Sequence, residues 1–218
     1  MARPIALLAT AFLVAGLTKA GPADAAEPGY YRVSGVAAGD VLNVRAAPQA
    51  GAEIVDTLAP GAAPVEVLEV EATASGEWGR VLSADANGWV AMRFLVPETP
   101  PGFAGTEVPQ GLTCLGTEPF WDLELVAGGR LRFSAVDTED VSLPLVAATA
   151  AVARIHRFAL IAGDGKRRAT AVLGRYETCS DGMSDRDFGW RIDLVLEGVH
   201  GDGAVSAYEG CCMVPVDR

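Results

Sequence analysis

The sequence is poor in histidine and contains no paired-cysteine metal motif. Its two histidines, His156 and His200, stand in no catalytic or metal-ligand spacing, and none of the four cysteines forms a C-x-x-C pair. Structural zinc and a redox-active dithiol are therefore not expected, because both depend on cysteine pairs of that kind. The sequence predicts no cofactor, no metal site and no catalytic residues.

Basic residues are also scarce, 17 against 28 acidic ones, for a formal charge of -11. Such a surface repels nucleic acid and anionic lipid heads, so a nucleic-acid partner is not expected. The long apolar run at residues 5–17 is too short to span a bilayer, which needs roughly 20 apolar residues. With the basic start before it and Ala23-Asp24-Ala25 after it, this run predicts a signal peptide over residues 1–25. The mature chain is then periplasmic or secreted, without membrane insertion.

A hydrophobic content of 50% excludes a disordered chain, and short β-type runs separated by turn residues fill residues 30–97. In one run Leu42 and Val44 alternate with Asn43 and Arg45, the period of a half-buried strand. Five such runs in under seventy residues predict a small barrel, because closing a sheet removes its exposed edges.

Residues 31–96 resemble the bacterial SH3-like domain. The resemblance rests on Leu42-Asn43-Val44-Arg45, Pro48, Pro60-Gly61, Trp78, Gly88-Trp89-Val90 and Phe94-Leu95. Members of that family are usually non-catalytic parts of exported proteins, and many are thought to bind cell-wall peptides or other envelope components. The resemblance therefore implies a partner of that kind.

The aromatic residues of this domain allow two interpretations. In one, Trp78 and Trp89 pack the core, beside buried valines and leucines. In the other, polar-tipped aromatics and neighbouring polar residues line a groove, since such residues are enriched where surfaces bind. The candidate groove residues, with Tyr30 beside them, are Tyr31, Asn43, Arg45, Trp78 and Trp89.

Residues 98–111 follow as a proline- and glycine-rich segment. Together with Pro97 it contains Pro100, Pro101 and Pro109. Proline density predicts an extended, semi-rigid linker that holds two domains apart.

Residues 112–218 predict a second all-β domain, an antiparallel β-barrel or sandwich of about seven strands. Its clearest element is a hairpin, with strands over 121–126 and 130–135 joined by Ala127-Gly128-Gly129. Pro144 places an edge or a bulge in the next strand. Residues 147–162 are ambiguous, because an alanine-rich start favours a helical turn and the residues from Ile155 onward favour a strand.

All four cysteines lie in this second domain, at Cys114, Cys179, Cys211 and Cys212. In an oxidising compartment they predict two disulfides, for which three pairings exist. A Cys211–Cys212 bond would close a strained ring, so each of these two is expected to bond separately to Cys114 or Cys179.

The second domain also resembles a family of small Gram-negative envelope proteins without an established activity. The resemblance covers about residues 112–214 and rests on Gly116-Thr117-Glu118-Pro119-Phe120-Trp121, Asp181-Gly182-Met183-Ser184-Asp185 and Gly210-Cys211-Cys212. It implies an envelope location and a β-barrel fold.

Residues of this domain suggest three kinds of chemistry. Cys179 with His156 or His200 would make a cysteine hydrolase, although an exported protein would normally use this thiol in a disulfide. Glu118 with Asp181 or Asp185 would suit glycoside cleavage, which needs two close carboxyl groups. A calcium loop is disfavoured, because the aspartates lack the usual spacing and Arg186 lies among them.

The expectation is an exported, non-enzymatic envelope binding or adaptor protein that recognises cell-wall peptide or an envelope protein. A cell-wall hydrolase using Cys179 or the carboxylates is the alternative. Asp181 and Asp185 are the candidate ligand contacts of the second domain, although a turn role is favoured for them.

Overall fold

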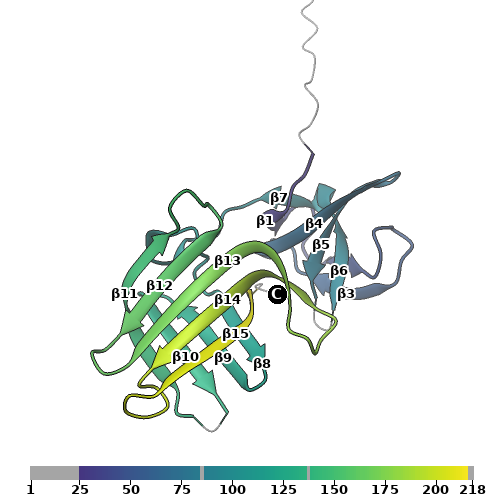
Figure 1. The fold of residues 1–218 in the computed structure, drawn as a ribbon. Helices are drawn as coiled ribbons and strands as arrows, with labels where there is room; N and C mark the ends of the chain where they lie inside the picture. The colour runs from purple at the N-terminus through teal and green to yellow at the C-terminus, as the bar shows by residue number, and fades with distance from the viewer. Residues whose placement is uncertain (1–24, 84–85, 137, 216–218) are drawn as a thin grey trace, which may run out of the picture.

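The computed structural model describes residues 25–83, 86–136 and 138–215. The fold is all-β, as the sequence predicts: a seven-stranded antiparallel sheet lies beside a closed antiparallel barrel of eight strands (Figure 1). The predicted signal peptide, apart from Ala25, lies outside the described residues. The helices of the described part are two single 3-10 turns, and neither is long or apolar enough to cross a membrane.

The first domain is the seven-stranded sheet, with strand order β3-β2-β6-β5-β4-β1-β7. Its elements are β1 Gly29–Val33, β2 Leu42–Arg45, β3 Ile54–Leu58, β4 Val65–Thr73, β5 Gly76–Leu82, β6 Asn87–Ala91, the turn η1 Met92–Phe94 and β7 Leu95–Pro97. Leu42 and Val44 are buried while Asn43 and Arg45 are half-buried, which confirms the alternation expected for β2.

Segment 98–111 differs from the expected spacer. It contains the turn η2 Phe103–Gly105, and its side chains Phe103 and Val108 are buried in the core of the barrel. The Glu98 amide also donates to the Tyr30 carbonyl at 2.9 Å, which ties the segment to the first domain. Proline density indicates local stiffness, but two apolar side chains bind this segment to the barrel, and the domains lie in contact.

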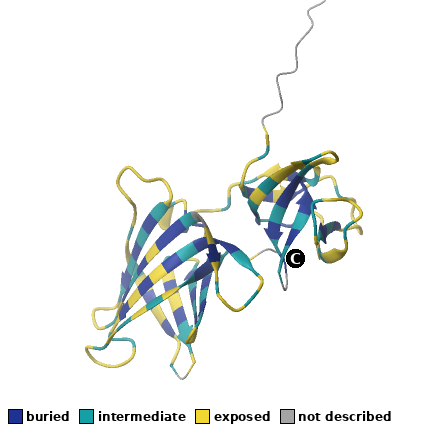
Figure 2. Ribbon diagram, turned by 45° about the vertical axis from the view of Figure 1, so that its right-hand side comes forward, coloured by how far each residue is buried: buried dark blue, intermediate teal, exposed yellow. Residues whose placement is uncertain are grey.

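The barrel closes in the order β10-β11-β12-β13-β14-β15-β8-β9. Its strands are β8 Thr113–Thr117, β9 Phe120–Val126, β10 Arg130–Ala135, β11 Val141–Ala150, β12 Arg157–Gly163, β13 Arg168–Ser180, β14 Asp187–Glu197 and β15 Val205–Met213. Buried and exposed residues alternate along these strands, so one set of side chains fills the barrel and the other faces outward (Figure 2).

The predicted hairpin is present as β9 and β10, whereas the ambiguous stretch begins within a strand. Residues 147–150 belong to β11 and pair with β12, so the helical interpretation of the alanine-rich run is wrong. The ladder shifts register between Leu145 and Ala147, directly after Pro144. This bulge is one of the two outcomes predicted for a proline in a strand.

Strands β13 and β14 are long and curve from the barrel towards the first domain (Figure 1). Their pairing shifts register between Arg175 and Cys179, which separates the barrel part of the hairpin from its far end. The far end carries the loop that joins β13 to β14, so this loop reaches the boundary between the domains.

Two disulfides form, Cys114–Cys212 and Cys179–Cys211, which is one of the two pairings that the sequence left open. Cys114 and Cys212 are buried in the barrel core. Cys179 and Cys211 belong to a separate apolar cluster around Phe188, against which Leu82 of the first domain packs. The prediction that Cys211 and Cys212 take separate partners is therefore confirmed.

Candidate functional site

Two of the predicted groove residues turn their rings inward. Tyr31 is 7% exposed and its hydroxyl donates to the Glu27 carbonyl at 2.6 Å. Trp78 is 3% exposed, with its indole N–H donating to Ser75 Oγ at 3.3 Å. Both aromatic faces are therefore used in packing, which matches the core interpretation of Trp78.

The other three predicted groove residues are half-buried and lie on neighbouring strands. Arg45 pairs with Trp89 in the β2–β6 ladder, and Asn43 lies two residues before Arg45, on the same side of β2. Arg45 Nη1 donates to the Ala52 carbonyl at 2.7 Å, across the loop between β2 and β3. Asn43, Arg45 and Trp89 thus share one surface region, and ligand binding there remains a prediction.

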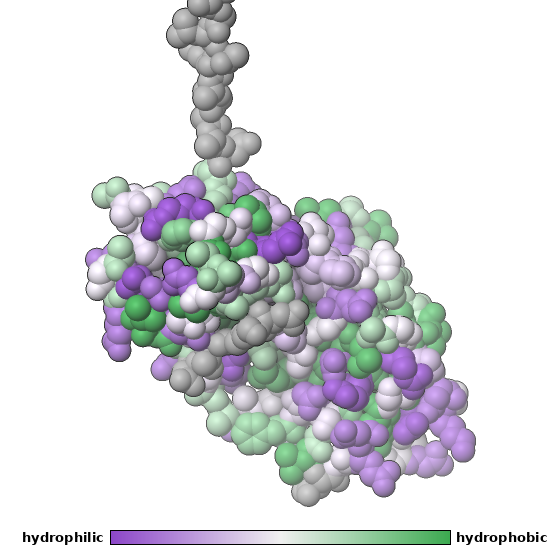
Figure 3. Space-filling view, turned by 180° about the vertical axis from the view of Figure 1, so that it is seen from behind, coloured by the Kyte–Doolittle hydropathy of each residue, from purple (hydrophilic) through white to green (hydrophobic). Residues whose placement is uncertain are grey.

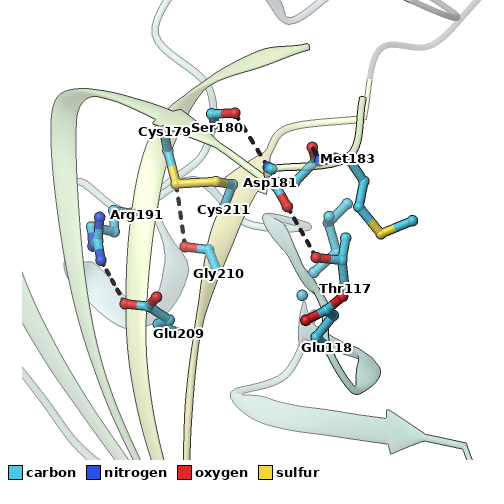
Figure 4. Close-up of a pocket in the computed structure, with 13 residues that line it drawn as sticks. Thr117, Glu118, Cys179, Ser180, Asp181, Met183, Arg191, Glu209, Gly210 and Cys211 are labelled. Atoms are coloured by element: carbon cyan, nitrogen blue, oxygen red, sulfur yellow. Dashed lines mark hydrogen bonds and ion pairs between the residues drawn. A yellow bond between two sulfur atoms is a disulfide. The ribbon is translucent and has the colours of Figure 1, made fainter. Parts of the chain in front are cut away.

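In the barrel domain the three sequence motifs meet at one cleft of about 420 Å³ (Figure 4). The Cys179–Cys211 disulfide lines this cleft. Arg191 and Glu209 lie on one side of the disulfide, joined at 2.7 Å, and Glu118 and Met183 lie on the other. Residues far apart in sequence are thus brought together by the strand order β14-β15-β8.

Asp181 lines this motif cleft, but its carboxylate holds its own loop in place. Its Oδ1 accepts from the amides of Met183 and Ser184 at 3.0 and 2.8 Å, and its Oδ2 accepts from the Ser184 hydroxyl at 2.8 Å. Burial acts to raise the pKa of Asp181, but these hydrogen bonds outweigh it and hold the pKa below its usual value. Gly182, at φ +74°, supplies the left-handed turn between them. Asp181 therefore stabilises the turn, as the sequence favours.

Asp185 lies away from the motif cleft, at the boundary between the domains. It forms an isolated parallel bridge with Ala86 of the first domain. Next to it, Asp187 accepts from Arg80 at 2.7 Å, while Asn87 donates to the Asp187 carbonyl and accepts from its amide. The loop that contains the aspartates is therefore a docking element between the domains.

The groups proposed for hydrolysis are distributed differently from the expectation. Glu118 and Asp181 line the same cleft, whereas Asp185 does not line it. Cys179 is bonded to Cys211 and so has no thiolate to act as a nucleophile in this state. Of the pairs considered for hydrolysis, Glu118 with Asp181 is the one that shares a cleft.

A buried polar contact between the domains involves Tyr30, Trp190 and Glu66. Tyr30 lies on β1 of the first domain, yet its ring belongs to the core of the barrel. Its hydroxyl accepts from the indole N–H of the fully buried Trp190 at 2.7 Å and donates to Glu66 Oε1 at 3.1 Å. Arg175 lies over the Tyr30 ring, 4.8 Å from its centroid.

Sequence reasoning placed Tyr30 in a groove and did not single out Glu66 or Trp190. One signal was present: in a strand that begins Tyr30-Tyr31, only one of two successive rings can enter the domain's own core. The other ring needs a second partner, and the partner strand is about 160 residues away.

Comparison with known families bears on the first domain. Residues 40–96 match the family model described as the bacterial SH3 domain. No curated protein and no solved structure matches the chain. The matched region runs from just before β2 through β7, so the part of the chain that packs Leu42, Val44 and Val90 in one core carries a bacterial SH3 domain.

Proposed function

We propose that this protein is an exported, non-enzymatic binding or adaptor protein of the bacterial cell envelope, whose SH3 domain recognises cell-wall peptide or an envelope protein. The observation that carries the proposal is the bacterial SH3 domain at residues 40–96, a binding module often associated with the cell wall. Two disulfides fit an oxidising compartment outside the cytoplasm.

The surface we assign to the partner contains Asn43, Arg45 and Trp89. An arginine beside a half-buried indole offers a cation, hydrogen-bond donors and an aromatic edge, the residue types enriched at interfaces. Because the barrel packs against the other part of the SH3 domain, through β1, β4 and the β5–β6 turn, this surface is left for a partner.

The test uses the mature chain, residues 26–218, incubated with purified peptidoglycan and with solubilised envelope proteins. We expect retention on one of these without release of soluble muropeptides. Arg45→Ala should reduce retention at least tenfold, whereas Arg130→Ala, the same charge change on the barrel, should leave it unchanged. Equal retention of both variants would refute the assigned surface.

A hydrolase is the second candidate, favoured by Glu118 and Asp181 in one cleft. Inverting glycosidases place two carboxyl groups about 6.5–9.5 Å apart, one as acid and one as base. In this chain the Asp181 carboxylate is engaged by three hydrogen bonds, which disfavours that role. If the wild type releases soluble muropeptides and Glu118→Gln does not, the protein is a hydrolase and the adaptor proposal is wrong.

A further inference from the structure

A second cleft lies at the boundary between the two domains. Its volume is about 480 Å³, and its walls come from the N-terminal segment, β4 of the SH3 domain, the β11–β12 loop, β13 and β14. The lining side chains that carry charge or can be protonated are Glu27, Glu66, His156 and Arg175. Neither domain alone encloses this space, so we call it the boundary cleft.

Glu66 is the distinctive group of this cleft. Its Oε1 accepts the Tyr30 hydroxyl at 3.1 Å, and Arg175 lines the same cleft and attracts the carboxylate, but within the described part of the chain this carboxylate takes part in no ion pair. A Cβ at Gly189 would lie 2.4 Å from Oε1, so glycine at that position makes room for the carboxylate. The fold thus half-buries a carboxylate and supplies no salt bridge for it.

A carboxylate without a salt bridge at a domain boundary lowers stability, because Arg175 on β13 and the hydrogen bonds offset only part of its desolvation. Retaining such a group in an open cleft points to a ligand that brings a cation into direct contact with it. The neighbouring walls offer apolar surface for the rest of such a ligand, from Leu68 on β4 and Phe188 on β14. A carboxylate beside apolar walls suits an alkyl chain that ends in an ammonium group.

We propose that the boundary cleft binds the primary ammonium group of an amino-acid side chain, in a free amino acid or a peptide, with the Glu66 carboxylate as its counter-ion. The inference rests on the proposed binding function and deepens it, by naming the ligand chemistry and placing the ligand between the domains. Glu27, on the N-terminal segment, adds a second negative charge to the same cleft.

The charged groups around Glu66 set how binding depends on pH. Burial raises the pKa of Glu66 to about 7, while the Tyr30 hydroxyl, Arg175 on β13 and the Trp190 indole act in the opposite direction. His156, on the β11–β12 loop, and Glu27 face the same cleft. An ammonium ligand pairs with the ionised carboxylate, so binding should release a proton near neutral pH and strengthen as pH rises.

The experiment is calorimetric titration of the mature chain, residues 26–218, with Nα-acetyl-lysine amide, which carries an ε-ammonium group and no other charge. The matched probe is Nα,Nε-diacetyl-lysine amide, in which that charge is removed. We expect the first probe to bind about tenfold more tightly at pH 8 than at pH 6, because the ionised fraction of Glu66 rises about tenfold across this range. We expect no binding of the second probe.

Glu66→Gln should abolish binding of Nα-acetyl-lysine amide, whereas Glu71→Gln, an exposed carboxylate on the same strand, should leave it unchanged. Circular dichroism checks that both variants fold. The wild-type protein gives an independent readout, since the heat of binding should differ between buffers of different ionisation enthalpy at pH 7 if a proton is released.

Equal binding of the two probes, full binding by Glu66→Gln, or no binding of the ammonium probe would each overturn the inference. If the ammonium probe fails while the protein is still retained on peptidoglycan or by an envelope protein, the proposed function stands without this site. Loss of both results would overturn both.

Discussion

At the scale of single residues, Tyr30 and Tyr31 show how two identical neighbours come to serve different domains. Successive side chains of a strand point to opposite faces. Tyr31 therefore enters the core of the SH3 domain, and Tyr30 enters the core of the barrel. Both are buried, at 8% and 7% exposure, so residue type and degree of burial do not distinguish them.

Glu66 makes stability depend on pH in a defined direction. Its pKa in the folded protein, about 7, lies above the ordinary value of 4.5, so the folded state keeps the proton at pH values where the unfolded chain has lost it. Stability then falls by about 1.4 kcal/mol for each pH unit between these two values and is constant outside them. We expect Glu66→Gln to be more stable than wild type at pH 8, and this advantage to shrink at pH 5.

Urea denaturation at the two pH values measures this difference. Glu71→Gln serves as the control, because that side chain is exposed on the same strand and should shift the midpoint equally at both. If the free energies of unfolding of the wild type and Glu66→Gln differ by the same amount at pH 5 and pH 8, burial does not raise the pKa of Glu66.

At the scale of elements, strand β15 uses adjacent cysteines to fasten two different layers. Cys212 points into the barrel and bonds to Cys114 on the neighbouring β8. Cys211 points outward and bonds to Cys179, at the start of the loop that docks on the SH3 domain. The inner disulfide thus holds barrel strands together, and the outer one fixes the docking loop.

The two disulfides should be separable by protease. Removing both cysteines of the outer bond, as Cys179→Ala with Cys211→Ala, should cost about 3 to 4 kcal/mol from a closed loop of 32 residues. It should also accelerate tryptic cleavage after Arg186, whose side chain now donates to Met213 Sδ and covers Phe188.

Limited proteolysis followed by mass mapping locates the cleavage. The comparison variant, Cys114→Ala with Cys212→Ala, should lose about 4 to 5 kcal/mol for its loop of 98 residues and expose sites throughout the barrel. If Arg186 is cut no faster in the outer variant than in wild type, the loop is held by contacts other than this disulfide.

Local patterns predicted several elements and failed where tertiary contacts decide. The β9–β10 hairpin follows from its alternation and glycine turn, and ring strain predicts that Cys211 and Cys212 take separate partners. Which of them bonds to Cys114 is decided by the register of β15 on β8. Residues 147–150 became strand because closing the barrel requires β11 to pair with β12, which outweighs the helix propensity of alanine.

The boundary between the domains was beyond prediction from the sequence for the same reason. Phe103 lies in a proline-rich segment that indicates a spacer, yet the barrel core accepts its ring. In the sequence, Glu66 is an ordinary outward-facing residue of an alternating strand. It becomes a candidate for binding a ligand only because the fold places Gly189 and Tyr30 next to it.

At the scale of the whole molecule, the domains form one unit with mixed polar and apolar surfaces. Hydrophilic and hydrophobic residues are interspersed over both domains on the face opposite that of Figure 1 (Figure 3). The contact between the domains combines the buried Tyr30 ring, the Arg80–Asp187 ion pair and the packing of Leu82. The two domains should therefore unfold together.

Tyr30→Phe tests this coupling, because it keeps the ring and removes the hydroxyl that satisfies the buried Trp190 indole. We expect a loss of about 2 kcal/mol, the cost of one unsatisfied buried donor, and a lower Tm by roughly 5 °C. Tyr31→Phe removes a hydroxyl that donates to the Glu27 carbonyl near the N-terminus, and it should lose less than half as much.

Scanning calorimetry follows both variants and the wild type. A single transition in the wild type is expected, since a strand of the SH3 domain contributes the Tyr30 side chain to the core of the barrel. Two well-separated wild-type transitions, or equal losses in the two variants, would show that the domains are thermodynamically independent.

The Tyr30–Trp190 contact also has a consequence for the order of biosynthesis. These residues are 160 positions apart, and a bacterial ribosome adds about 5 to 20 residues per second, so Tyr30 is made roughly 10 to 30 s before its partner. During that interval the outward ring of Tyr30 has no barrel core to enter, and its hydroxyl has no indole from which to accept a hydrogen bond. The unfinished chain thus carries an apolar side chain that becomes buried only when the barrel is complete.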